Sequence, residues 1–166
     1  MSIDLLRTLV DYNSWRNRLL LDKATGLDAA TLAAPTRFPM GSLLATLVHI
    51  MGAEQVWVQR MQGVSPSAFP RPADFPTTQA LQARWHEVEA ELREFLAGLD
   101  GAGLERIVEF RRLAGDLMSQ RVSDILLHVV NHGTQHGAEV AQMLTELGRS
   151  PGDIDLIVFV RRRDAR

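Results

Sequence analysis

Residues 123–148 read SDILLHVVNHGTQHGAEVAQMLTELG, and this stretch decides the fold. Its pattern is helical, with Ser123 suited to cap the start and Gly148 suited to end it. The segment therefore predicts a long amphipathic helix, which needs partners of similar length to cover its apolar stripe.

Three earlier segments supply such partners. Their apolar residues also recur at three- and four-residue steps, and turn residues separate them. They run from Ile3 to about Leu27, from Gly41-Ser42 to about Gly63, and from Thr77 or Thr78 to Asp100-Gly101. Because such helices bury their stripes only against one another, the sequence predicts an all-α four-helix bundle.

The connections carry their own signals. Residues 64–78, VSPSAFPRPADFPTT, are too rich in proline for regular structure and are predicted to form an extended surface loop. Residues 104–122 alternate weakly around Gly115 and favour a short hairpin. A last short helix is expected over Ile154 to Arg161, and nothing divides residues 1–166 into more than one domain.

Composition excludes several classes of protein. With 18 Lys and Arg against 20 Asp and Glu in 166 residues, there is no positive field for nucleic acid. No cysteine is present, so a bound metal needs His, Asp or Glu ligands. We find neither a signal-peptide pattern nor a membrane span, and we expect a cytoplasmic protein that does not bind membranes.

The histidines are the most informative polar residues. His128, His132 and His136 lie at four-residue steps, which place neighbours on one face of a helix. Two imidazoles one turn apart are able to bind one side of a metal ion, and a third ligand from another helix completes the set. His49, surrounded by apolar residues in the second long helix, is best suited to be that third ligand.

Other interpretations of these histidines stay open at this point. A pair of histidines four residues apart is often just a polar, partly exposed helix face, and no HExxH zinc motif is present. His128 fits equally a ligand, a residue that orients a ligand, or a solvated side chain. His86 lies between polar neighbours and is assigned to the surface.

Three segments together resemble the DinB-like family, also called the DinB/YfiT-like metalloenzymes. They are DYNSWRNRLLLDKA at 11–24, LVHIMGAEQVWVQRMQG at 47–63 and ILLHVVNHGTQHGAEVAQMLTELG at 125–148. The resemblance implies helices in up-down-down-up order, frequent dimers, and a divalent metal bound by His49, His132 and His136 at one end of the bundle. Relatives include thiol-dependent maleylpyruvate isomerases and transferases, and other members are known only as damage-inducible.

This chain departs from the family pattern after His132. Relatives often read Asn-His-x-x-His-His-Arg-Gly-Gln, whereas here Gln135 replaces a histidine, Gly137 an arginine and Glu139 a glutamine. The three ligand positions are retained. The loss of that arginine removes a fixed cation near the expected site.

A neutral set of three nitrogen ligands favours zinc or nickel, with iron also suitable, over magnesium or calcium. Such an ion acts as a Lewis acid towards water or a thiol, and because the chain has no cysteine the thiol must be an external small molecule. Asn131 and Gln135 are candidates for polar contacts at the rim of the pocket. Glu54 is expected to be a surface residue or to support a ligand rather than bind metal itself.

Three hypotheses follow. The first is a metal-dependent enzyme acting on a small molecule, of the thiol S-transferase or hydrolase type. The second is a metal-binding or stress-response protein without turnover. The third is a structural helical homodimer whose histidines have no function.

Overall fold

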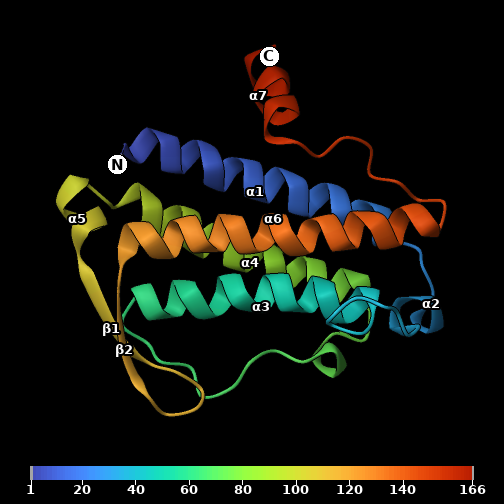
Figure 1. Ribbon diagram of the computed structural model, residues 1–166, viewed down its shortest axis with the longest axis horizontal. Helices are drawn as coiled ribbons and strands as arrows, with labels where there is room; N and C mark the ends of the chain where they lie inside the picture. The colour runs from blue at the N-terminus through green and yellow to red at the C-terminus, as the bar shows by residue number, and fades with distance from the viewer. Residues whose placement is uncertain (1, 166) are drawn as a thin grey trace.

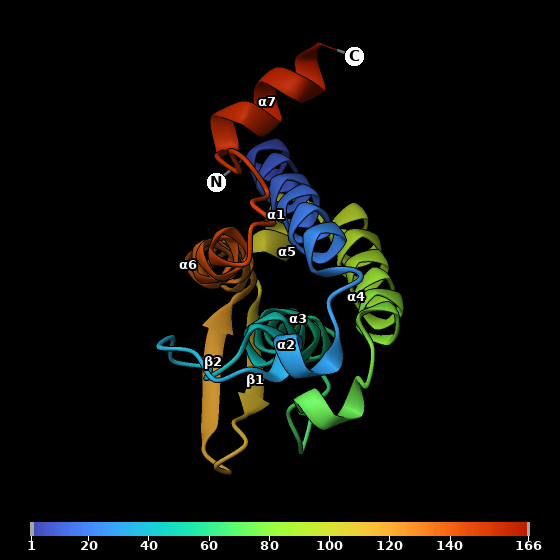
Figure 2. The ribbon, with the colours of Figure 1, turned by 90° about the vertical axis from the view of Figure 1, so that its right-hand side faces the viewer.

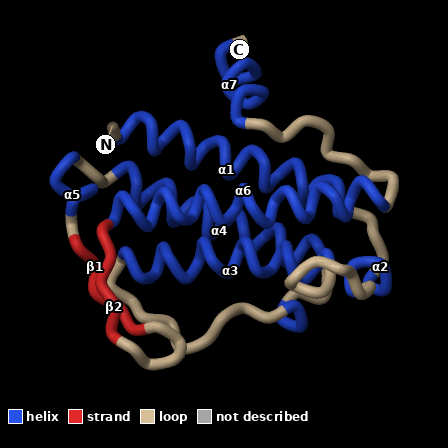
Figure 3. Tube along the Cα trace, in the orientation of Figure 1, coloured by secondary structure: helices blue, strands red, loops and turns tan. Residues whose placement is uncertain are grey.

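The computed structural model describes residues 2–165 and is built mainly from helices (Figure 3). In chain order its elements are α1 (Ile3–Ala24), α2 (Ala29–Ala33), α3 (Leu43–Met61), the 3-10 turn η1 (Pro72–Asp74), α4 (Thr78–Ala97), α5 (Gly101–Glu105), β1 (Ile107–Arg111), β2 (Leu117–Arg121), α6 (Val122–Glu146) and α7 (Leu156–Asp164). The four long helices predicted from periodicity are α1, α3, α4 and α6.

These four helices form an all-α bundle. Seen along the bundle axis, α1 and α3 occupy opposite corners, with α6 and α4 between them (Figure 2). From the side, α1 and α6 run in one direction and α3 and α4 in the other (Figure 1). This is the up-down-down-up order, so the predicted fold class is confirmed. No helix within residues 2–165 is long and apolar enough to cross a membrane.

The helix starts follow the sequence in two of three cases. Ser42 and Thr77 cap α3 and α4, each accepting a 3.1 Å hydrogen bond from the backbone three residues on. The predicted cap at Ser123 is wrong, because strand β2 leads directly into α6 and the helix begins at Val122. A backbone hydrogen bond from Val122 to the Arg106 carbonyl fixes this junction at the base of the hairpin.

The predicted hairpin is present as β1 and β2, paired antiparallel, with Gly115 at a φ of +95° in the turn. Val108 and Phe110 of β1 face the bundle and are buried, whereas every residue of β2 is exposed. The hairpin therefore packs on the bundle through one strand only.

Two short helices were not predicted. Asp28 caps α2 and Asp100 caps α5, each through a 2.7 Å hydrogen bond to a backbone N–H. At five residues each, they are too short to show helical periodicity. The expected C-terminal helix is present as α7 and projects from the bundle beside α1 (Figures 1 and 2).

The core consists of two apolar clusters with a polar layer between them. One cluster lies near the hairpin end and includes Leu6 and Leu126; the other lies at the opposite end and includes Leu20 and Leu144. The buried polar residues between them come from all four long helices: Asn13, Ser14, Arg16, Asn17, Glu54, Glu89 and His136.

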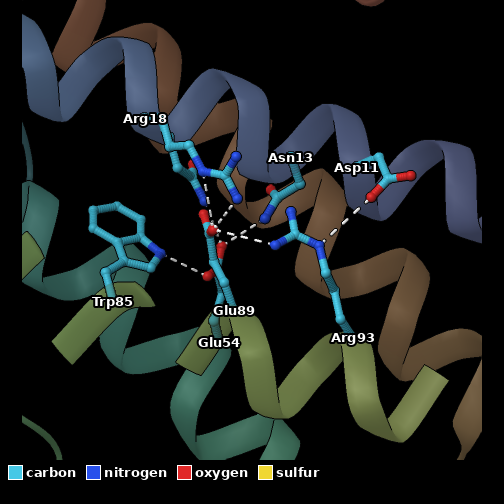
Figure 4. Close-up of polar contacts among 8 residues, drawn as sticks. Asp11, Asn13, Arg18, Glu54, Trp85, Glu89 and Arg93 are labelled. Atoms are coloured by element: carbon cyan, nitrogen blue, oxygen red, sulfur yellow. Dashed lines mark hydrogen bonds and ion pairs between the residues drawn. The ribbon is translucent and has the colours of Figure 1, made fainter. Parts of the chain in front are cut away.

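At the centre of this layer, a carboxylate and a guanidinium are joined through two asparagines. Nδ2 of Asn13 and of Asn17 donate to Oε1 of Glu54 at 2.6 and 2.8 Å, and Trp85 Nε1 donates to Oε2 at 2.7 Å (Figure 4). Arg16 Nη2 donates to Oδ1 of both asparagines. The two amide groups therefore connect the guanidinium of Arg16 on α1 with the carboxylate of Glu54 on α3.

Burial favours the neutral forms of Glu54 and Arg16, whereas their neighbours favour the charged forms. Burial raises the pKa of Glu54, although the hydrogen bonds from Asn13, Trp85 and Asn17 favour the charged form. Burial lowers the pKa of Arg16, and the nearby Glu54 opposes this shift. Glu54 is only 1% exposed, so the surface position that the sequence offered as one alternative for it is wrong.

Two glycines of α6 make room for Arg16. A Cβ at Gly137 would lie 2.9 Å from Arg16 Nε, and a Cβ at Gly133 would lie 2.5 Å from Asn13 Oδ1 and closer still to Arg16 Nη2. Arg16 Nη1 also donates to Thr134 Oγ1 at 3.0 Å. The glycines therefore allow close approach of the α1 guanidinium to α6.

We expect Gly133→Ala to lower the free energy of unfolding by about 1–3 kcal/mol, because the new Cβ displaces Arg16 and Asn13. Helix propensity alone predicts the opposite, a gain of about 1 kcal/mol. Urea unfolding followed by circular dichroism measures the difference. Gly98→Ala is the matched control. Gly98 has a helical backbone conformation, and the nearest atom that a Cβ added there would meet lies 3.7 Å away. Equal stability of the two variants would contradict the packing of Arg16 against α6.

Candidate metal centre

The three predicted ligand histidines lie on two neighbouring helices. His49 is on α3, and His132 and His136 lie one turn apart on α6, which packs against α3. All three are well inside their helices, level with the polar layer. The cluster therefore lies beside the middle of the bundle, not at one end as the family resemblance implied.

The three imidazoles converge on one point. Nε2 of His49 and Nε2 of His132 are 3.0 Å apart, and the His136 ring centroid lies 4.7 Å from that of His49 and 4.6 Å from that of His132. One nitrogen from each residue falls within 4.8 Å of the others. Two nitrogens that each lie about 2.1 Å from one ion are about 3.0–3.4 Å apart, so His49 and His132 have the spacing of two ligands of one transition-metal ion, with His136 beside them.

Burial and neighbouring groups favour the neutral forms of His132 and His49. Burial, together with neighbouring His49 and His136, lowers the pKa of His132 to about 3. Burial and His136 also lower the pKa of His49. A neutral imidazole is the form that binds a metal, so protons do not compete for His132 near pH 7.

Glu139 orients the third histidine. Its Oε2 lies 2.8 Å from Nδ1 of His136, which is buried, so Nδ1–H donates to the carboxylate and Nε2 is left for the cluster. Sequence reasoning identified Glu139 only as a departure from the family pattern. Its spacing of three residues after His136, on the same helix face, was the signal that it pairs with that ring.

The proline-rich loop covers part of the cluster. The Phe69 ring lies 5.6 Å from the His49 ring, and a Cβ at Gly52 would lie 2.7 Å from Phe69. Gly52, one turn after His49 on α3, thus lets this loop lie close to the histidines. The loop is extended as predicted, apart from the single turn η1. Neither Gly52 nor Phe69 was singled out from the sequence.

The other candidates lie around the cluster, outside its centre. His128 is exposed, with its ring 5.6 Å from that of His132. Asn131 and Gln135 are exposed and make no side-chain hydrogen bond with the cluster within residues 2–165. His86 is exposed on α4, as expected.

A fixed cation is nevertheless close to the cluster. Arg16 packs against Gly137, the position where relatives often have arginine, and its charge contributes to the lowered pKa of His132. The sequence suggested that this cation was lost. The structure shows that α1 supplies one from the other side of α6, already paired through asparagine with Glu54.

Comparison with known proteins agrees with this architecture. The chain is 23% identical over 163 residues to Protein DinB of Bacillus subtilis (strain 168), covering 94% of this chain and 95% of that protein. The sequence profile of the DinB family matches residues 1–164. The match includes all three clustered histidines and the whole bundle that positions them. The chain therefore belongs to the DinB family.

Proposed function

We propose that this protein is a divalent-metal-dependent enzyme that acts on a small molecule, with His49, His132 and His136 as the metal ligands. The observation that carries the proposal is the convergence of the three rings, with His49 Nε2 and His132 Nε2 3.0 Å apart. Zinc or nickel suits this nitrogen set best, and iron is also compatible.

The number of ligands favours catalysis over a structural role. Within residues 2–165, the cluster contains three metal-binding side chains and no fourth His, Asp or Glu. Structural zinc sites have four protein ligands, whereas catalytic sites have three and keep a position open. His49 and His132 are only partly buried, which is compatible with access for a small molecule.

The chain's own residues have separate roles in this proposal. His49 and His132 present Nε2, and Glu139 holds His136 in the tautomer whose Nε2 faces the cluster. The Phe69 ring, 5.6 Å from that of His49, adds an apolar side chain beside the cluster. A bound divalent ion would supply Lewis acidity, which lowers the pKa of a water or of an external thiol. The reaction type is therefore a thiol S-transfer or a hydrolysis. The homodimer and the cytoplasmic location stay predictions.

Protein purified without a histidine tag is expected to hold about one zinc or nickel ion per chain, and its melting temperature should rise when the ion is added to the apoprotein. His132→Ala should lose both properties. His128→Ala is the matched control, because it removes a neighbouring ring outside the converging group and should retain the metal. Elemental analysis below about 0.1 ion per chain, without any thermal response, would contradict metal binding.

Removal of Glu139 is expected to weaken metal binding without removing a ligand. Glu139→Ala should raise the dissociation constant for zinc by about 10–100-fold, and Glu139→Gln should have a smaller effect because its amide oxygen still accepts from His136. Competition with a chromophoric chelator measures both. Glu146→Gln, at an exposed position on the same helix, should bind zinc like the wild type. An unchanged affinity in Glu139→Ala would refute the orienting role.

A turnover assay distinguishes the proposed enzyme from the alternative, a metal-binding protein without catalytic activity. The zinc- and nickel-loaded wild type should convert at least one substrate in a panel of thiols and small electrophiles, and His132→Ala should fall to the uncatalysed rate. Glu146→Gln should keep the wild-type rate. Metal binding without any histidine-dependent turnover across the panel would favour the non-catalytic alternative.

A further inference from the structure

The second strand of the hairpin has an open edge. Just beyond the antiparallel strand pairs, Arg112 N–H donates to the Asp116 carbonyl at 2.9 Å, so this pair is of the hydrogen-bonded kind. Such pairs alternate with pairs that share no hydrogen bond, so the N–H and C=O of Leu117 and Ser119 and the N–H of Arg121 point away from β1. Within residues 2–165, no backbone hydrogen bond from another element reaches these outward groups.

The outer edge of β1, by contrast, contacts another part of the chain. Arg111 N–H also points away from its partner strand, and it donates to Ser65 Oγ at 3.0 Å. β1 buries Val108 and Phe110 against the bundle, whereas β2 is exposed along its whole length and lies at the margin of the molecule (Figure 2). Of the two strands, β2 is therefore the one whose edge is available for pairing.

The sequence of β2 leaves this edge unprotected. Proteins usually protect an exposed strand edge with a proline, a bulge or a charge within the strand. β2 reads LMSQR, its pairing with β1 is continuous, and its one charged residue, Arg121, lies at the end. Half of the large apolar residues that are exposed within residues 2–165 also lie in the hairpin: Ile107, Leu113, Leu117 and Met118.

A second copy of β2 fits this edge. In an antiparallel pair centred on Ser119, the two Ser119 residues exchange both backbone hydrogen bonds, and Arg121 N–H donates to the Leu117 carbonyl of the second copy. A single two-fold rotation thus pairs the outward groups of both copies. The assembly is closed at two chains, because the rotation uses the β2 edge of each copy.

The side chains also favour antiparallel self-pairing. Antiparallel order places Arg121 opposite Leu117 of the second copy, whereas parallel order would place two Arg121 side chains together. Asp116 directly precedes Leu117, so each end of the pair has one acidic and one basic residue. Ile107 pairs with Arg121 within the hairpin, so Ile107 and Leu117 of the second copy flank the aliphatic part of Arg121.

We propose that β2 pairs antiparallel with β2 of a second copy of this chain, which joins two two-stranded sheets into one continuous sheet. The β2 edge is then the interface of a homodimer. The proposal does not depend on the proposed function. Because one strand pair makes a small interface, the dimer should dissociate on dilution.

Sedimentation velocity from low micromolar to submillimolar protein concentration tests the interface. The wild type should shift from the mass of one chain to the mass of two as its concentration rises. Ser119→Pro should stay monomeric, because proline removes an outward N–H and leaves the hydrogen bonds to β1 intact. Glu109→Pro is the matched control, since Glu109 pairs with Ser119 and its N–H points to the opposite edge of the hairpin, and it should dimerise like the wild type.

A charge exchange at residue 119 tests the register of the pair. Ser119→Lys and Ser119→Glu should each be monomeric, because each places two like charges opposite one another, and an equimolar mixture should form a dimer again. That restoration requires residue 119 to lie opposite itself. These exposed substitutions keep every β1–β2 hydrogen bond, so they decide the question if Ser119→Pro fails to fold by circular dichroism.

A wild type that stays monomeric up to submillimolar concentration would overturn the proposal. A dimer that persists in Ser119→Lys and in Ser119→Glu would show that another surface forms it. A mixture of these two variants that stays monomeric, or a wild-type species larger than a dimer, would also contradict the two-fold pairing of β2.

Discussion

The buried pairing of Arg16 with Glu54 through Asn13 and Asn17 is the constraint on which the rest of the bundle depends. Two charges inside an apolar core are costly unless both are fully paired. The pairing is satisfied only when α1 and α3 hold one relative position across the bundle. Trp85 adds α4 to the same network, and Thr134 with the two α6 glycines adds the fourth helix.

The histidine cluster depends on the relative positions of the helices that this polar layer fixes. Gly133 directly follows His132, and Gly137 directly follows His136, so the helix face that receives Arg16 is adjacent to the face that carries the rings. A slip of α6 by one turn against the other helices would separate His49 from His132, and it would also remove Thr134 and the two glycines from Arg16. Specificity of packing and convergence of the rings therefore have the same physical origin, while Glu139 and Phe69 complete the surroundings of the cluster.

Much of this was predictable from local patterns. Periodicity identified the long helices, the turn at Gly115 and the spacing of His132 and His136, because each depends on neighbouring residues alone. The short helices α2 and α5 lacked a periodic signal, and the Ser123 cap failed because β2 leads into α6. The contacts of Glu54, Arg16 and Phe69 join segments far apart in the chain, and only the folded arrangement reveals which polar residues are paired.

X-ray absorption spectroscopy of the zinc-loaded protein tests the central assignment most directly, because it identifies the atoms bound to the ion. The account predicts a first shell that includes three imidazole nitrogens at about 2.0–2.1 Å, with the outer-shell scattering of histidine rings, and a loss of that signal in His132→Ala. A shell made of oxygen alone, or a spectrum that does not change in His132→Ala, would contradict the assignment of His49, His132 and His136 as the metal ligands.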